Sequence, residues 1–221
     1  MGTTTPLQKR RILIVDDHPI VRQGLAQAIG RERDLEVSGE AANVAEALQR
    51  MEGDCPDVAI VDIALDGEDG IELIDYIKSR RPSVRILVCS AHDEDTFAGR
   101  VLRAGAMGYV SKREGIPGIV AAIRKVLQGE IYLSPQMTTR LLQRAAIGQS
   151  LDPNPVEALS NRELQVFQMI GEGLNTAQIA NKLHLSPKTV ESHRKLLKMK
   201  LRVQTSAQLS RRAFQWVQEN M

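Results

Sequence analysis

The stretch VAIVDIALDGEDG, residues 58–70, joins an apolar run to a cluster of acidic residues. The run from Val58 to Val61 predicts a buried strand, and Asp62 follows it directly. Three interpretations compete for Asp62. They are a ligand of a calcium loop, a residue of an acidic surface turn, and a reactive carboxylate held at the end of a buried strand.

The spacing of the residues after Asp62 excludes a calcium loop of the EF-hand type. Such a loop needs an oxygen ligand at its third position and a glutamate at its twelfth. This chain has Ala64 and Leu73 at those positions. A surface turn suits the segment DGEDG, residues 66–70, which is rich in turn-forming residues. It does not suit Asp62, which follows four apolar residues.

Strands and helices alternate through the first half of the chain. Short apolar runs predict strands at residues 11–15, 35–39, 58–61, 85–89 and 108–110. Helical spacing of apolar residues predicts helices near residues 21–29, 41–51, 70–80, 94–104 and 115–128. Five such βα units predict an α/β domain with a doubly wound parallel sheet covered by helices on both faces. No glycine-rich phosphate-binding loop follows a strand, so nucleotide binding has no support.

The expected strands end in residues that can carry chemistry. In a doubly wound sheet, functional residues gather at the carboxyl ends of the strands. Those ends hold Asp16, Asp17, Asp62, Ser90 and Lys112. Clustered carboxylates repel one another unless a cation joins them, and ligand sets made only of oxygen atoms suit Mg²⁺. A carboxylate can also accept a phosphoryl group, whose charge a metal ion and a lysine would neutralise.

Four motifs, DDHPIVRQGL, VDIALDGEDG, CSA and GYVSK, resemble in order those of the receiver domain of two-component response regulators. The resemblance covers the whole first half of the chain. It implies that Asp62 accepts a phosphoryl group from a partner histidine kinase. It also implies that Asp17 and Asp62 hold Mg²⁺ with the backbone carbonyl of Ala64, and that Asp16 helps through water.

The same resemblance assigns roles to residues of the last two strands. Lys112 and Ser90 would contact the phosphoryl group. Tyr109 stands at the position of the family's aromatic switch and would pack inward on phosphorylation. Family members usually have proline where this chain has Asp66, a difference that bears on the rigidity of the loop.

An independent phosphatase is the alternative enzymatic interpretation. Haloacid-dehalogenase-type phosphatases also use an aspartyl nucleophile and Mg²⁺, but they need a second aspartate two residues later. Ala64 stands there, so an activity beyond accepting and losing the phosphoryl group is not expected. His18 and His92 are not expected to be metal ligands. His92 and Ala64 border the position of the attacking water and are expected to influence the lifetime of the phosphate.

The last third of the chain predicts only helices. Residues 160–163, SNRE, form a capping box before an apolar stripe, and Ser186 with Pro187 begins a later helix. Helix, short helix, tight connection and helix is the helix-turn-helix layout, and a fourth helix is expected near residues 206–218. Residues 182–202 contain seven basic residues and one acid, Glu191. This segment therefore predicts a DNA-binding surface.

The helix after Ser186 has two faces. Val190, Leu197 and Leu201 share the face expected to pack on the other helices. The opposite face is expected to meet DNA and carries Lys188, Glu191, Ser192 and Lys195.

Residues 159–201 are similar to the LuxR-type DNA-binding domain. The similarity implies contacts to bases from Glu191, Ser192 and Lys195. It implies contacts to the DNA backbone from Thr176, Lys188, Thr189 and His193. Two interpretations of Glu191 remain open: it accepts a hydrogen bond from a cytosine amino group, or it pairs with Lys195 one helical turn away.

Both halves together resemble the NarL/FixJ subfamily of response regulators. The expected domains are a receiver at residues 1–128, a partly helical linker at 129–156 and a LuxR-type helix-turn-helix domain at 157–221. The formal net charge is −3 over residues 1–128 and +4 over residues 151–221. The resemblance implies regulation of transcription through phosphorylation of Asp62, which would promote homodimerisation, release the DNA-binding domain, or both.

The expected partners follow from these roles. They are a sensor histidine kinase, double-stranded DNA with a two-fold operator, a second copy of the chain and RNA polymerase. No apolar run reaches membrane-spanning length, and Cys55 and Cys89 have no pattern, so a cytoplasmic protein without a membrane partner is expected. A quorum-sensing LuxR protein is the non-enzymatic alternative, but its lactone pocket needs aromatic residues, which make up only 3% of this chain. The kinase, the operator and the choice between activation and repression stay open.

Overall fold

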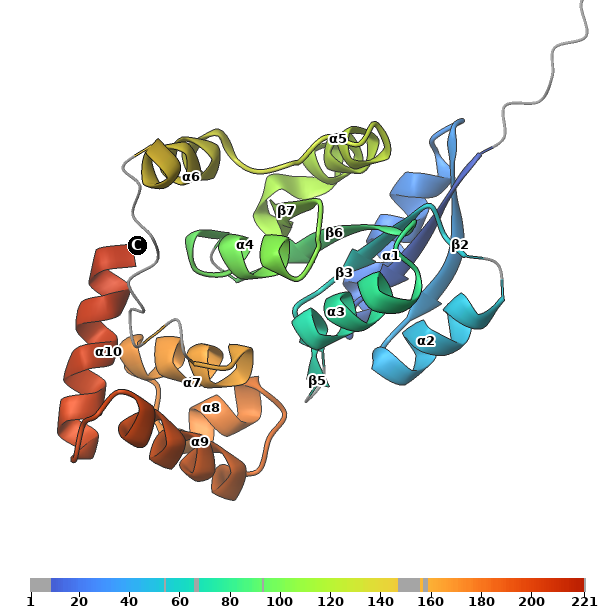
Figure 1. Cartoon of the computed structure of the whole chain (residues 1–221). Coiled ribbons are helices and arrows are strands. Elements are labelled where there is room, and N and C mark those ends of the chain that lie inside the picture. The colour runs from blue at the N-terminus through green and yellow to red at the C-terminus, as the bar shows by residue number, and fades with distance from the viewer. Residues whose placement is uncertain are drawn as a thin grey trace, which may run out of the picture. The chain divides into compact units, whose positions relative to one another are not determined.

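The chain folds as two compact units, Met1–Thr138 and Thr139–Met221. The structure is a computed structural model, drawn in Figure 1, that describes residues 9–53, 55–65, 68–92, 94–146, 156 and 159–220. The linker sequence GQSLDPNPVEA, residues 148–158, lies outside the described residues except for Val156.

A parallel sheet of five strands forms the centre of the first unit, in the order β2-β1-β3-β6-β7. The strands are β1 (Arg10–Val15), β2 (Leu35–Ala41), β3 (Val58–Val61), β6 (Arg85–Ser90) and β7 (Gly108–Ser111). All four residues of β3 are buried, because this strand lies between two others and has helices on both faces. The predicted α/β fold with a doubly wound parallel sheet is confirmed.

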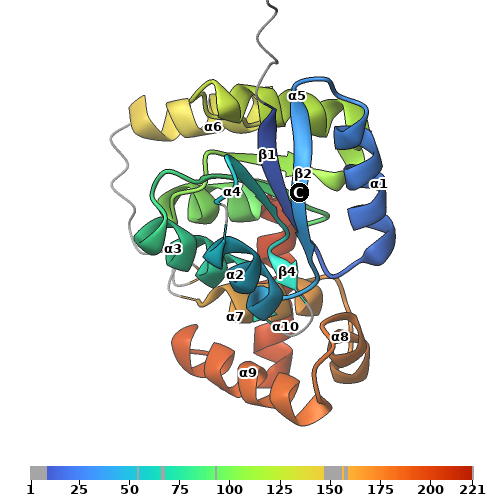
Figure 2. The same ribbon diagram turned by 90° about the vertical axis from the view of Figure 1, so that its right-hand side faces the viewer.

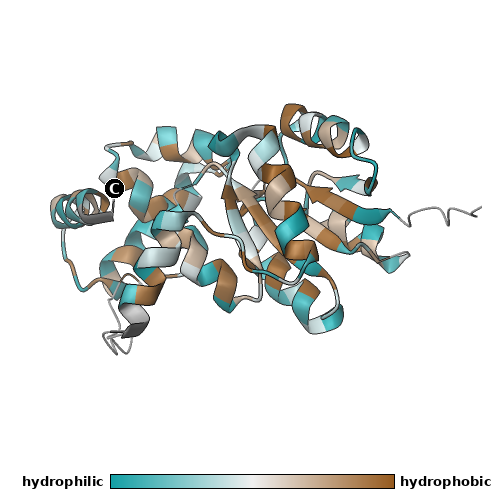
Figure 3. Cartoon of the chain, turned by 90° about the horizontal axis from the view of Figure 1, so that it is seen from above, coloured by the Kyte–Doolittle hydropathy of each residue, from teal (hydrophilic) through white to brown (hydrophobic). Residues whose placement is uncertain are grey.

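Helices cover both faces of this sheet. They are α1 (Pro19–Gly30), α2 (Val44–Glu52), α3 (Gly70–Arg80), α4 (Glu94–Arg103) and α5 (Gly115–Leu127). Figure 2 shows α1 and α5 on one side of the strands and α2, α3 and α4 on the other. Because side chains alternate along a strand, Ile12 and Ile14 point to the first side and join a core that includes Leu25 and Ile123. The strands accordingly appear largely hydrophobic in Figure 3.

The acidic segment after Asp62 forms a small hairpin. Its strands are β4 (Ala64–Leu65) and β5 (Glu68–Asp69), which pair antiparallel. Asp66 and Gly67, which connect them, lie outside the described residues. The Asp69 carboxylate caps α3 by accepting a hydrogen bond from the amide of Ile71 at 2.8 Å. The predicted turn thus also sets where α3 begins.

A segment after α5 adds to the edge of the sheet at β7. Tyr109 donates its amide to the carbonyl of Tyr132 at 2.9 Å, and Tyr132 donates its own to the carbonyl of Met107 at 3.0 Å. Two carboxylates hold this segment further. Glu114 accepts from the Tyr132 hydroxyl at 2.8 Å, and Glu94 accepts from the amide of Ser134 at 2.9 Å. The expected helix in the connection follows as α6 (Pro135–Ala146).

The second unit contains the four predicted helices of the helix-turn-helix layout. They are α7 (Asn161–Gly171), α8 (Thr176–Lys182), α9 (Pro187–Lys200) and α10 (Ser206–Asn220). The expected stripe of α9, Val190, Leu197 and Leu201, is buried. In the described part of the chain, no helix combines the length and apolar character that crossing a bilayer requires.

Glu163 joins the start of α7 to the end of α9. Its buried carboxylate accepts hydrogen bonds from the amide of Ser160 and the ammonium of Lys200, each at 2.6 Å. Burial alone would raise the pKa of Glu163, but the hydrogen bonds from Lys200 and Ser160 outweigh it and hold the pKa below its ordinary value. The charged form of Glu163 therefore stabilises this unit.

Replacing Gly70 by alanine tests how closely α3 approaches the strand that carries Asp62. A Cβ atom at Gly70 would lie 2.1 Å from the carbonyl oxygen of Asp62 and 2.7 Å from Cα of Ile63. We expect Gly70→Ala to lower the free energy of unfolding by about 1 to 3 kcal/mol, because α3 must shift. Urea denaturation followed by circular dichroism measures this.

Gly24→Ala is the matched control, because nothing lies within 4 Å of a Cβ atom there in α1. It should raise the free energy of unfolding by about 0.5 to 1 kcal/mol. Equal stability of the two variants would contradict the close approach.

Replacing Glu163 by glutamine tests the buried ion pair with Lys200. The pKa is lowered on folding, so the stabilisation is fully present above the ordinary pKa of 4.5 and is lost as the pH falls through the lowered value. At pH 7 we expect Glu163→Gln to cost about 1 to 3 kcal/mol, and at pH 3 the difference from wild type should shrink.

The fluorescence of Trp216, the only tryptophan, reports on this unit, because its ring packs on Phe167 with centroids 5.7 Å apart. Glu172→Gln is the control and should change stability by less than about 0.5 kcal/mol at either pH. A cost for Glu163→Gln that is independent of pH would contradict the role of the charge.

Candidate functional site

Asp62 lies at the carboxyl end of β3, and three contacts fix its position. Its backbone amide donates to the carbonyl of Val15 at 2.9 Å. Its Oδ1 accepts from the amide of Ala64 at 3.2 Å, and its Oδ2 lies 2.6 Å from Nζ of Lys112. Only 3% of the residue is exposed. The end of the buried strand thus holds a carboxylate in one defined orientation.

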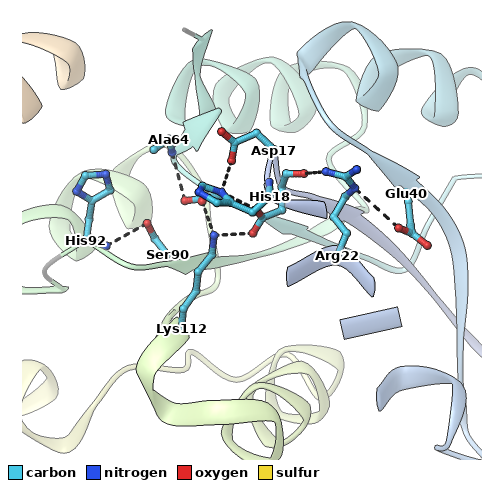
Figure 4. A network of polar contacts seen from close by, with 10 residues as sticks. Asp17, His18, Arg22, Glu40, Ala64, Ser90, His92 and Lys112 are labelled. Carbon is cyan, nitrogen blue, oxygen red and sulfur yellow. Dashed lines mark hydrogen bonds and ion pairs between the residues drawn. The ribbon is translucent and has the colours of Figure 1, made fainter. Parts of the chain in front are cut away.

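Asp16 and Asp17 follow β1 and face the same point. Asp16 is 2% exposed, and its Oδ1 accepts from the amide of His18 at 2.9 Å. Asp17 Oδ1 lies 2.6 Å from Nδ1 of His18. One ligand atom from each of Asp16, Asp17, His18 and Asp62 lies within 4.8 Å of the others. The three predicted carboxylates are therefore brought together. Figure 4 shows Asp17 and His18 of this cluster, with Lys112 beside them.

Lys112 connects two of these carboxylates. Its Nζ lies 2.6 Å from Oδ2 of Asp16 and 2.6 Å from Oδ2 of Asp62. The residue follows β7 and begins the short 3₁₀ helix η1 (Lys112–Glu114). Burial by itself would lower the pKa of Lys112, but attraction to Asp62 and Asp16 holds it above its ordinary value. The ammonium is therefore kept charged at the centre of the site.

The carboxylates carry more negative charge than Lys112 offsets. Burial and repulsion from Asp62 raise the pKa of Asp16, although Lys112 opposes the shift. A divalent cation beside the carboxylates would relieve this repulsion. Oxygen atoms of carboxylates, backbone carbonyls and water are the ligands that Mg²⁺ takes, so Asp16, Asp17 and Asp62 fit this ion.

Ser90 and Tyr109 hold the loop that follows β6. The Ser90 hydroxyl is buried and accepts from the amide of His92 at 3.3 Å. Its own proton has no acceptor among the described residues, so it is available to a ligand. The Tyr109 side chain is fully buried and donates its hydroxyl to the carbonyl of His92 at 2.8 Å. Tyr109 thus already occupies the inward position that the resemblance associates with phosphorylation.

Two residues of this site were not identified from the sequence. The contacts of His18 with the carboxylates were not foreseen: its Nδ1 lies 2.6 Å from Asp17 and 3.3 Å from Asp16. That His18 is not a metal ligand stays a prediction. Arg22 donates from Nη1 to the carbonyl of Asp16 at 2.5 Å and lies 3.8 Å from Glu40 (Figure 4). The run Asp-Asp-His is a signal for His18, because consecutive residues after a strand share one turn. No local pattern indicates Arg22, which lies one helical turn inside α1.

The exposed face of α9 carries the residues predicted to contact bases. Lys188, Glu191, Ser192 and Lys195 are all exposed. In the part of the chain that the structure describes, Glu191 forms no ion pair with Lys195. Its Oε1 instead accepts from the hydroxyl of Thr176 at 2.6 Å and lies 3.7 Å from Nε of Arg194. Glu191 thus contacts one residue of α8, Thr176, and one residue of α9, Arg194.

The residues predicted to contact the DNA backbone are less uniform. Lys188 is exposed, and Thr189 and Thr176 are half-buried. The Thr189 hydroxyl lies 2.7 Å from that of Ser186. His193 is half-buried, and its Nδ1 is buried with no hydrogen-bond partner among the described residues. Burial and the nearby Arg162 lower its pKa, so His193 is held neutral and is a weaker candidate for a phosphate contact.

Two family models match the chain. Residues 12–124 match the response regulator receiver domain. Residues 157–213 match the bacterial regulatory proteins of the luxR family. These two matches cover both units of the fold in the predicted order.

Curated relatives match over nearly the full length. The oxygen regulatory protein NreC of Staphylococcus carnosus is 34% identical over 204 residues, which cover 90% of this chain and 94% of that protein. The response regulator GacA of Pseudomonas aeruginosa is 34% identical over 200 residues, with 90% and 93% covered.

Solved structures agree with these relatives. RcsB of Salmonella enterica, bound to promoter rprA with the phosphomimetic BeF₃⁻, has a TM-score of 0.58 and 29% identity over 92% of this chain and 98% of that one. A structure of two RcsB dimers bound to two parallel DNAs has a TM-score of 0.56 and 28% identity, with 92% and 97% covered. With a receiver at its start and a LuxR-type helix-turn-helix at its end, the chain belongs to the NarL/FixJ-type two-component response regulators and is a DNA-binding transcriptional regulator.

Proposed function

We propose that Asp62 accepts a phosphoryl group from a sensor histidine kinase and that this modification controls the binding of α9 to double-stranded DNA. The observation that carries the proposal is the contact of one half-buried ammonium, Lys112, with the buried carboxylates of Asp16 and Asp62 at 2.6 Å each. The contact joins the ends of β1, β3 and β7 at one point of the sheet edge.

The chemistry needs few groups. A carboxylate oxygen of Asp62 attacks the phosphorus of a phosphohistidine, the P–N bond breaks, and its electron pair stays on the imidazole nitrogen of the kinase. The product is an acyl phosphate on Asp62. When held by Asp17, Asp62 and the carbonyl of Ala64, with Asp16 helping through water, Mg²⁺ supplies positive charge that offsets the phosphoryl oxygens.

Lys112 and Ser90 respond to the new group. Phosphorylation removes the negative charge of the Asp62 carboxylate and places a doubly charged phosphoryl group near the Lys112 ammonium. The ammonium therefore turns toward the phosphoryl oxygens. Ser90 donates its hydroxyl proton to one of them. Ser90 accepts a hydrogen bond from the amide of His92, and the carbonyl of His92 accepts one from the Tyr109 hydroxyl. A movement of Ser90 would therefore displace His92 and Tyr109. The loop between β6 and α4 and strand β7 would change together.

The output is binding of DNA by a dimer. RcsB, which the chain resembles, is seen as dimers on DNA, and this supports a homodimer on a two-fold operator. The exposed basic residues of α9 and the net charge of +4 over residues 151–221 favour a polyanionic partner. RNA polymerase stays a predicted partner. The domain limits at residues 128 and 156 also stay predictions.

Asp62→Asn should abolish phosphorylation. We expect wild-type protein with Mg²⁺ and acetyl phosphate to gain the mass of one phosphoryl group, while Asp62→Asn gains none, because an amide is a poor nucleophile. Intact-mass spectrometry measures the transfer, and light scattering measures dimerisation. Asp75→Asn, at an exposed position of α3, is the matched control and should behave as wild type. Transfer to the Asp62→Asn variant would contradict the assignment.

Lys188→Ala and Lys195→Ala should separate contacts to phosphates from contacts to bases. Loss of a phosphate contact at Lys188 should weaken binding to all sequences and reduce the slope of log K against log salt by about 1. Loss of a base contact at Lys195 should mainly relax the preference at one base pair. Fluorescence anisotropy at several salt concentrations measures both. Lys125→Ala, which removes an exposed charge from α5, is the control. Unchanged binding of both α9 variants would contradict the interface.

A further inference from the structure

We propose that Glu191 is a specificity-determining residue that selects cytosine in the major groove, and that Thr176 is the positioning residue that aims its carboxylate. This inference rests on the proposed binding of DNA by α9. It names the base that Glu191 contacts and explains why this base is preferred.

The two oxygen atoms of the Glu191 carboxylate are in different situations. The side chain is 60% exposed. Oε1 accepts from the Thr176 hydroxyl at 2.6 Å and lies 3.7 Å from Nε of Arg194. Oε2 accepts no hydrogen bond from any residue that the structure describes. A carboxylate has about four acceptor positions, so Oε2 keeps its capacity for an external donor.

The negative charge of Glu191 limits the groups of DNA that its side chain can contact. Glu191 is the only acid among residues 182–202, which contain seven basic residues. A carboxylate on a surface that meets DNA is repelled by phosphates, and one long contact of 3.7 Å with the half-buried Arg194 offsets this only in part. A hydrogen bond from a base amino group is the contact with DNA that favours a carboxylate.

The pattern of the major groove selects the base. Cytosine presents its N4 amino group there, whereas guanine presents the acceptors N7 and O6. Thymine presents the acceptor O4 and a methyl group, and adenine places the acceptor N7 beside its N6 amino group. A carboxylate is therefore attracted to cytosine, repelled by guanine and thymine, and less well matched by adenine.

Thr176 restricts the orientation of the Glu191 carboxylate. An exposed glutamate on a helix loses side-chain entropy when it orders at an interface. The hydroxyl of Thr176, fixed at the start of α8, already restricts Glu191 before DNA arrives. The Thr176 hydroxyl has one proton and donates it in the hydrogen bond to Glu191. The same hydroxyl therefore does not donate to a DNA phosphate.

The alternative is that Glu191 and Thr176 only connect α8 to α9. A purely structural contact would affect the stability of the second unit and the affinity for all sequences equally. It would not change which base is preferred. The test therefore measures base preference separately from affinity and stability.

The experiment selects operators from randomised double-stranded DNA with the full-length protein in Mg²⁺ and beryllofluoride, followed by sequencing. For wild type we expect cytosine at one position of each half-site. Glu191→Gln has the same shape, and Thr176 and Arg194, both donors, keep its amide oxygen inward. The amide nitrogen then takes the place of Oε2 and turns an acceptor into a donor. The preference should move from cytosine to a base that presents acceptors, guanine or thymine, with a loss of roughly tenfold or more for cytosine.

Thr176→Val removes the hydroxyl with little change of shape. Cytosine discrimination, measured as the ratio of affinities for operators with and without cytosine, should fall several-fold, and Thr176→Ser should restore it. Trp216 fluorescence confirms that each variant is folded. Glu172→Gln, which removes a carboxylate from the residue that follows α7, should leave every position of the operator unchanged.

The outcomes are distinct. An operator that is enriched by wild type and is identical for Glu191→Gln would overturn the inference and leave the proposed function intact. Loss of affinity for all sequences in Thr176→Val, without a change of base preference, would also overturn it. No enriched sequence for wild type would overturn the proposed sequence-specific binding, and the inference with it.

Discussion

The contact of Lys112 with Asp16 and Asp62 is the constraint on which the first unit depends. Parallel strands that end in aspartates bring negative charges together in a buried place, where repulsion is strong and water is scarce. A cation must join them for the sheet edge to be stable, and Lys112 supplies one from β7. In the sheet, β6 separates β7 from β3, and Lys112 connects the end of β7 directly to the carboxylates after β1 and β3. A change of charge at Asp62 would therefore act on the end of β7. In the proposed function, the group that stabilises this edge of the sheet is also the one that responds to phosphorylation.

Much of the fold could be predicted because its signals are local. Apolar runs gave all five strands of the main sheet, and helical spacing with capping residues gave the helices. The capping box at Ser160 and the stripe of Val190, Leu197 and Leu201 both lie within a few helical turns, so the sequence alone contains the geometry. The convergence of Asp16, Asp17 and Asp62 followed from the general property that parallel strands end at one edge.

The remaining features depend on residues far apart in the chain. Pairing of Glu191 with Lys195 was one of two open interpretations and came from the helical-pair rule. That rule considers one helix and does not include Thr176 on α8, which donates to Glu191. The inward position of Tyr109 depends on the carbonyl of His92, which no pattern indicates. The pairing of Tyr132 with β7 was not expected, because a single residue pair leaves no alternation in the sequence.

The pairing at Tyr132 also affects how such proteins can be recombined. The receiver match ends at residue 124, yet the segment through Ser134 completes the edge of the sheet and is tied to α4 and η1. A chimera that joined this receiver at residue 124 to another output domain would leave the edge of β7 without its partner and expose unpaired backbone groups to other chains. Exchange of output domains between regulators of this kind would therefore need to carry the segment along as part of the receiver.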